Sequence, residues 1–276
     1  MRNLLTTTAI AFCSFAVQAQ VKMPQPSPGQ TIEQDFGMGK IEVTYSRPAM
    51  RGRKVFGDLV PYGKLWRTGA NSATTIKFTQ PVEIMGKKVD TGTYALYTVP
   101  GVDNWEIILN KGTTNWGTGG YKESDDVIRI KAPAEKLKME IENFTLLFDN
   151  VEPESIDLWM AWDKTGVRIP IKANIKDRLR ADVENALKGE KKPYWTAAQF
   201  YNEYDKNYPL ALDNLNKGIA ENDKAYWMYL YKARIQKQMG DNAGAKTSSQ
   251  KSLELARSEK NDDYVKLNED FLKGLK

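Results

Sequence analysis

The sequence predicts a two-part β plus α protein, in which an antiparallel β-sandwich is followed by a short domain of helical repeats. A β-barrel is the alternative for the first part. Between residues 41 and 171, apolar residues recur with the period of two that is typical of strands. After residue 173 the period becomes helical, and a pattern recurs after 34 residues. A chain of 276 residues also favours more than one domain.

Residues 1–19, "MRNLLTTTAIAFCSFAVQA", are typical of a secretory signal peptide. They contain an early cation at Arg2, an apolar stretch over residues 4–17, and small residues at Val17 and Ala19, after which cleavage is expected. No stretch approaches the roughly 20 apolar residues that a membrane-spanning helix needs. The sequence therefore predicts a periplasmic or secreted protein with no integral membrane segment.

The sandwich domain is predicted over residues 20–173. Its expected strands are "IEVTY" (41–45), "TIKF" (75–78), "YALYTV" (94–99), "WEIIL" (105–109), "VIRI" (127–130), "MEIENFTLLF" (139–148), "DLWMAW" (157–162) and "VRIPI" (167–171). "MGKKV" (85–89) and "DKTG" (163–166) are predicted as tight hairpin turns, because Gly and Asp accept the positive φ that such turns require. About nine short strands with no helical pattern between them favour the sandwich.

The helical domain is predicted over residues 174–276. Leu179, Val183 and Leu187 form one apolar helix face, which ends at Gly189. Five residues are then matched 34 positions later: Trp195, Ala211, Lys217, Gly218 and Ile219 by Tyr229, Ala245, Lys251, Ser252 and Leu253. This period resembles the tetratricopeptide repeat, and predicts two repeats over about residues 192–259 with a capping helix from about Asp262.

Two interpretations of these repeats remain. A concave peptide-binding surface usually draws on three or more repeats, so the sequence favours packing and docking onto the sandwich. The alternative is a protein partner bound by the helices.

The charge distribution does not favour nucleic-acid binding. Residues 20–173 hold 20 Lys and Arg against 19 Asp and Glu, and residues 174–276 hold 19 against 16, which gives net charges of +1 and +3. A phosphate-tracking surface needs clustered cations. The exception is residues 47–67, where six cations face only Asp58 and the net charge is +5.

The residues that are absent limit the chemistry further. The chain has no histidine, and its single cysteine, Cys13, lies in the signal peptide. This excludes His-based and thiol catalysis in the mature chain, and we predict no metal and no cofactor. Carboxylate chemistry stays open, and its candidates are Asp125, Asp126, Glu152, Glu154 and Asp157. A solvated loop is the favoured interpretation of these residues.

Three motifs in the first domain carry a family resemblance: "SRP" (46–48), "RGR" (51–53) and "WRTGAN" (66–71). With "GTYALYTVPG" (92–101), "WEIILN" (105–110) and "WGTGGY" (116–121), they closely resemble the domain of unknown function 2911 family of secreted bacterial proteins. The resemblance covers about residues 30–173. It implies a fold family and an exported location, but transfers no catalytic residue.

The connection over residues 47–73 is the predicted site, because a long Arg-rich loop without strand pattern is often functional. Arginines recognise carboxylate, phosphate or sulfate, and tryptophans offer flat apolar faces that also suit sugars. The predicted ligand-binding residues are Arg47, Arg51, Arg53, Trp66, Arg67, Asn71 and Trp116. In the alternative interpretation the arginines hold the loop down through backbone carbonyls and Trp66 fills the core.

The first functional hypothesis is therefore an exported, non-catalytic protein that binds an anionic or carbohydrate ligand. A scaffold that acts through the helical repeats is the second, and a carboxylate-dependent glycoside hydrolase is the third.

Overall fold

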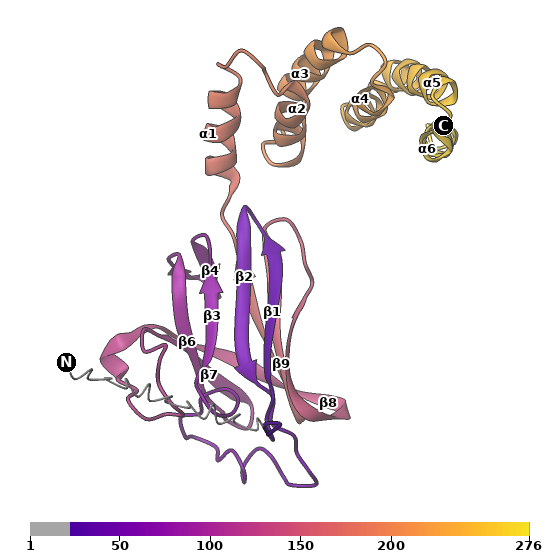
Figure 1. Ribbon diagram of the computed structural model, residues 1–276. Helices are drawn as coiled ribbons and strands as arrows, with labels where there is room; N and C mark the ends of the chain where they lie inside the picture. Colours follow the sequence, from indigo (N-terminus) through magenta and orange to yellow (C-terminus); the bar gives the residue numbers. More distant parts are fainter. Residues whose placement is uncertain (1–22, 276) are drawn as a thin grey trace, which may run out of the picture.

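The computed structural model describes residues 23–275, which form a sheet followed by a row of helices (Figure 1). The sheet is antiparallel, with nine strands in the order β1-β2-β3-β6-β7-β8-β9-β4-β5. These are β1 (Gly29–Phe36), β2 (Gly39–Ser46), β3 (Thr74–Phe78), β4 (Val82–Ile84), β5 (Lys87–Val89), β6 (Gly92–Val99), β7 (Asn104–Asn110), β8 (Asp126–Asp149) and β9 (Ser155–Lys172). A 3-10 helix, η1 (Glu123–Asp125), precedes β8. The sheet is open, with β1 and β5 at its free edges.

The strand β9 doubles back on itself. An extended strand of its length would span roughly 60 Å, yet the N–H of Ala173, just after β9, donates to the carbonyl of Glu154, just before it, at 3.0 Å. The reversal lies at Asp163, whose φ is +55°. The turn predicted at "DKTG" is therefore confirmed. The turn predicted at "MGKKV" is confirmed as well, since Met85 and Gly86 join the short strands β4 and β5.

The long strand β8 also bends back. Arg168 of β9 lies 3.8 Å from Glu135 and 2.8 Å from Asp149, although these two carboxylates are far apart along β8. The strand register shifts between Lys136 and Ile141, and this irregular segment is where the chain turns. The two strands expected within β8 correspond to its two arms.

The core lies between the two halves of the sheet. In β2, Ile41, Val43 and Tyr45 alternate with more exposed residues and face inward. The hydroxyl of Tyr45 accepts a hydrogen bond from the backbone N–H of Leu146 in β8 at 3.0 Å. Each large apolar side chain buried in this way contributes about 1.5–3 kcal/mol to folding. This facing of two sheet halves is the predicted sandwich.

Six helices follow the sheet: α1 (Lys176–Ala186), α2 (Tyr194–Glu203), α3 (Tyr208–Glu221), α4 (Tyr226–Gln238), α5 (Asn242–Ser258) and α6 (Asp262–Lys273). They agree with the predicted helices, and α2–α3 and α4–α5 span the two stretches that were predicted as repeats. Ala211 and Ala245 are fully buried. A Cβ at Gly218 would lie 3.1 Å from the sulfur of Met228, so only a small residue fits. Membership of the tetratricopeptide family stays a prediction.

Two side chains join the helices to the sheet. Leu179 of α1 and Tyr204, which follows α2, pack against both the sheet core and the first helical core. Asp205 accepts hydrogen bonds from Arg180 and lies 3.3 Å from Lys176, which ties α2 to α1.

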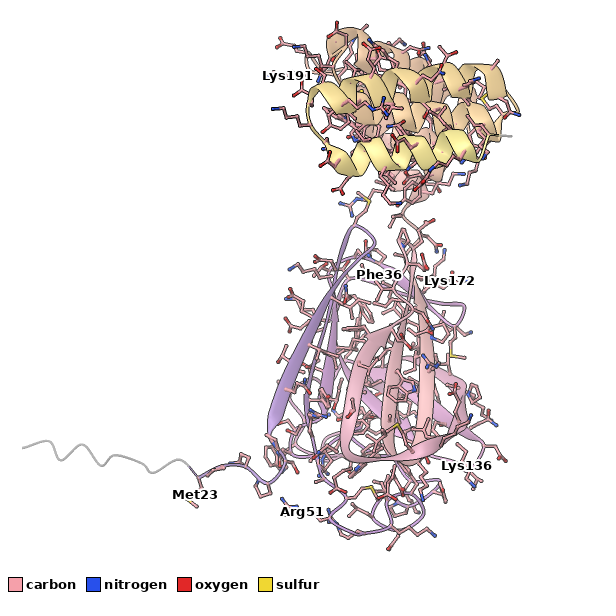
Figure 2. The ribbon with its side chains drawn as sticks, turned by 90° about the vertical axis from the view of Figure 1, so that its right-hand side faces the viewer. Met23, Phe36, Arg51, Lys136, Lys172 and Lys191 are labelled. Atoms are coloured by element: carbon pink, nitrogen blue, oxygen red, sulfur yellow. The ribbon has the colours of Figure 1, made fainter. Side chains whose placement is uncertain are left out.

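The two ends of the sheet differ in what surrounds them. Phe36 and Lys172 lie at the end that faces the helices, and Arg51 and Lys136 lie at the opposite end (Figure 2). Within residues 23–275 no helix has the length and apolarity that crossing a membrane requires. The predicted signal peptide lies outside the described residues.

Candidate functional site

The loop over residues 47–73 connects β2 to β3 and is held down by three arginines. Arg47 donates to the carbonyl of Phe144 at 3.1 Å and to the hydroxyl of Thr145 at 2.9 Å. Arg51 donates to the carbonyl of Pro26 at 3.3 Å. Because these donors are satisfied within the chain, these side chains brace the loop.

Arg53 has the same bracing role in the same loop. Its Nε donates to the carbonyl of Met50 and its Nη2 to the carbonyl of Ala49, both at 2.8 Å. This closes a tight turn of the loop on itself and engages two of the five N–H donors of the guanidinium.

Trp66 and Asn71 also act within the fold. Trp66 stacks on Trp162 at 6.0 Å between ring centroids, and its Nε1 donates to the carbonyl of Gly69 at 3.0 Å. Asn71 has a φ of +61°, and its amide donates to the carbonyl of Ser27 and the hydroxyl of Ser46, each at 3.2 Å. The side-chain N–H groups of both residues are therefore engaged within the fold.

Arg67 differs from the other arginines. Trp66 and Thr98 exchange two backbone hydrogen bonds, of 2.7 and 2.9 Å, and form an antiparallel bridge. In this register Arg67 stands opposite Tyr97 on the outer face of the sheet, since successive side chains alternate between faces. Within the described residues the Arg67 guanidinium forms no hydrogen bond or ion pair, and its Nε is buried without a partner. Burial lowers the pKa of Arg67.

A second loop, over residues 111–121, lies beside Arg67. The N–H of Gly117 donates to the carbonyl of Asn71 at 3.0 Å, and the N–H of Ala73 donates to the carbonyl of Asn115 at 3.2 Å. Gly117 has a φ of +66°, and a Cβ there would lie 3.6 Å from Nη1 of Arg67. The positive φ favours glycine at this position, and the distance places Gly117 directly beside the guanidinium. Its neighbour Trp116 is 71% exposed, so this ring lies in solvent rather than in the core.

A polar network supports this second loop from below. Asn115 donates to the hydroxyl of the fully buried Tyr97 at 3.1 Å. The hydroxyl of Tyr121 lies 2.9 Å from Asp126 and accepts from Arg129 at 2.7 Å. Burial, followed by the hydrogen bond to Asp126, raises the pKa of Tyr121 to about 12. The network fixes the loop that carries Trp116.

Of the seven predicted residues, Arg67 is the arginine whose guanidinium forms no hydrogen bond within residues 23–275, and Trp116 is the exposed aromatic residue on the loop beside it. The sequence analysis missed Tyr97, Asn115 and Tyr121, which position them. Asn115 directly precedes Trp116 within a glycine-rich stretch, and an amide between glycines and an aromatic is the signal that marks this loop. No sequence signal places Tyr97 under Arg67, because that pairing depends on strand register.

A sequence model of the domain of unknown function 2911 family matches residues 27–171, which is more than half of the chain. The chain belongs to this family. No curated protein and no solved structure matches it.

The matched region contains the whole candidate site. Both loops lie within residues 27–171, together with nearly all of the sheet, while the helices lie outside. The Arg67 and Trp116 arrangement therefore belongs to the family domain. The family description assigns it no function.

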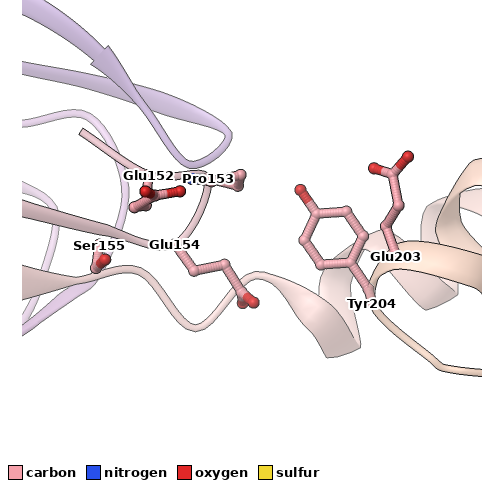
Figure 3. A pocket seen from close by; sticks show the side chains of 6 residues that line it. All are labelled: Glu152, Pro153, Glu154, Ser155, Glu203 and Tyr204. Atoms are coloured by element: carbon pink, nitrogen blue, oxygen red, sulfur yellow. The ribbon is translucent and has the colours of Figure 1, made fainter. Parts of the chain in front are cut away.

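A cleft lies where the sheet meets the helices (Figure 3). Its volume is about 270 Å³, and on the helical side Tyr204 points toward the loop of residues 152–155, with Glu203 beside it. Two of the predicted carboxylate candidates, Glu152 and Glu154, line it. Across residues 23–275 no group of three or more acidic side chains is arranged to hold a metal ion.

Proposed function

We propose that this protein is an exported, non-catalytic binding protein whose sheet domain binds an anionic or carbohydrate ligand between Arg67 and Trp116. The observation that carries this proposal is the free guanidinium of Arg67. Each of the other predicted arginines donates to a backbone carbonyl, whereas Arg67 donates no side-chain hydrogen bond within residues 23–275.

The Arg67 guanidinium is partly buried. A partly buried guanidinium without an anion loses hydration, and no group within residues 23–275 replaces it. Its Nε is shielded, but the two terminal nitrogens are not among the buried unsatisfied atoms, so they reach solvent. An anionic group that binds there supplies the missing partner through charge-assisted hydrogen bonds.

Trp116 supplies the second half of the site. A large aromatic ring that is 71% exposed buries little of its own area in the fold. Trp116 is nevertheless held on a braced loop, because its backbone bridges Ser72. A rigid, exposed aromatic face beside a cation suits a ligand with one flat apolar side.

The experiment is a thermal-shift screen of residues 20–276 against small anions, organic acids and oligosaccharides. A ligand that binds only the folded state stabilises it by about 2.7 kcal/mol at a hundredfold excess over Kd. We expect a clear upward shift of Tm in the parent protein, which disappears in Arg67→Met and Trp116→Ala. Lys64→Met is the matched control, because it removes one exposed charge from the same loop and is expected to keep the shift.

Two results would contradict the proposal. One is a ligand shift that survives both substitutions, which would place the site elsewhere. The other is the absence of any shift across the whole panel, which would remove the ground for a binding function of this domain.

A further inference from the structure

We propose that the ligand is an acidic saccharide, whose carboxylate binds Arg67 while its ring lies against Trp116. This inference rests on the proposed binding function and narrows it to one class of ligand. A uronic-acid residue combines both chemistries in one unit: a planar carboxylate, and a ring with one apolar face and hydroxyls at its rim.

The charge at the site calls for a single carboxylate. Arg67 is recessed next to Tyr97 and Gly117, and it has no ion-pair partner within residues 23–275. Arg129, the other arginine of this face, is already paired with Glu106 at 2.6 Å and Asp126 at 2.9 Å. One planar guanidinium matches one carboxylate through two parallel hydrogen bonds.

The surroundings of Trp116 suit a hydroxylated ring. Thr114 and Thr118 lie two residues before and after Trp116 in the chain, and Ser72 pairs with Trp116 in the β-bridge. All three side chains are exposed. None of them forms a hydrogen bond within the described part of the chain, in contrast to the hydroxyls of Thr68 and Thr74 on the inner side of the sheet. Free hydroxyls around an exposed aromatic face offer both donors and acceptors to sugar hydroxyls.

Arg67 and Trp116 are linked through Gly117. A Cβ at Gly117 would lie 3.6 Å from Nη1 of Arg67, and Trp116 is the direct neighbour of Gly117 in the chain. Trp116 is not stacked on Arg67 itself, which leaves its face available.

The experiment is a calorimetric titration of residues 20–276 with pairs of saccharides that differ only in the carboxylate. The probes are digalacturonate against galactobiose, and a mannuronate disaccharide against mannobiose, with sodium sulfate and sodium phosphate as simple anions. The variants are Arg67→Met, Trp116→Ala and the charge-matched control Lys64→Met. A near-ultraviolet circular dichroism spectrum of each variant establishes that it is folded.

We expect at least one acidic disaccharide to bind about tenfold or more tightly than its neutral partner. Arg67→Met should remove this preference and leave the neutral sugar unchanged, while Trp116→Ala should weaken both, and Lys64→Met neither. Equal binding of acidic and neutral sugars, or an acidic preference that survives in folded Arg67→Met, would overturn the acidic class but leave the proposed binding function intact. Binding of sulfate or phosphate without any saccharide would overturn it as well. Absence of binding by every probe would count against both the acidic ligand class and the proposed binding function.

Discussion

Replacing Arg67 by methionine separates a binding role from a bracing role. Methionine keeps the unbranched apolar stem and removes the guanidinium, whose Nε is buried without a partner. A buried unsatisfied donor costs roughly 1–3 kcal/mol. Since Arg67 is only partly buried, we expect the ligand-free variant to gain about 1 kcal/mol.

The matched comparison is Arg129→Met on the same face of the sheet. Arg129 bonds Glu106, Asp126 and the hydroxyl of Tyr121. Its removal leaves the Asp126 carboxylate, whose side chain is only 11% exposed, without its cation. We expect a loss of roughly 1–3 kcal/mol, because unpaired charges in partly buried positions are costly.

The assay is thermal unfolding followed by circular dichroism, without ligand. For a domain of this size, about 1 kcal/mol corresponds to about 2–4 °C in Tm. Arg67→Met should therefore melt about 2–4 °C above the parent protein, and Arg129→Met should melt below it. The reasoning fails if Arg67→Met melts as far below the parent as Arg129→Met does, because Arg67 would then hold the loop in place as the other arginines do.

Three further outcomes follow from local chemistry. Because burial raises the pKa of Tyr121 to about 12, its contribution to stability is complete below the ordinary tyrosine pKa of about 10 and is lost as pH rises toward 12. Urea unfolding at alkaline pH should show this loss, and Tyr121→Phe should show a smaller one, because other tyrosines whose pKa is raised by burial still titrate; an unchanged loss would contradict the role of Tyr121. Gly69 has a φ of +151°, and a Cβ there would lie 3.0 Å from the carbonyl of Ser46, so Gly69→Ala should cost roughly 1–3 kcal/mol in urea unfolding, and an unchanged midpoint would contradict this. The hydrogen bond from Arg180 lowers the pKa of Asp205, so this carboxylate stabilises the fold above about pH 4, and the stabilisation is lost as pH falls below that. Asp205→Asn should remove this part of the acid sensitivity. An acid transition identical to that of the parent protein would argue against a stabilising Arg180–Asp205 pair.

The helical part shows how well periodicity predicts local structure. The 34-residue recurrence placed Ala211 and Ala245 at equivalent helix crossings, and both are fully buried there. Helix period and turn residues act over a few positions of the chain, so they can be read from it directly. The sequence favoured docking of these helices onto the sandwich, but the residues that make the contact, Leu179 and Tyr204, depend on segments that are distant in the chain and were not predicted.

Most strands of the sheet and its tight turns were predictable, but β1 and the short strands β4 and β5 were not, and neither was the strand pairing. The turn at Asp163 follows from residues that tolerate positive φ. The bend of β8 around residues 136–141 does not, because it arises from a shift of register against β9. Register is fixed by the whole set of core side chains rather than by any local motif.

The candidate site, too, was predictable only in part from the sequence. The sequence by itself determined the two-part architecture, the absence of histidine and the concentration of arginines between residues 47 and 67, since these depend on composition and local spacing. Only the tertiary structure decided which arginine is free: Arg47, Arg51 and Arg53 meet backbone carbonyls, whereas Arg67 stands across from Tyr97 beneath Gly117. The partners of a long, flexible side chain come from segments brought together by folding, so identical residues in one short loop acquire different roles.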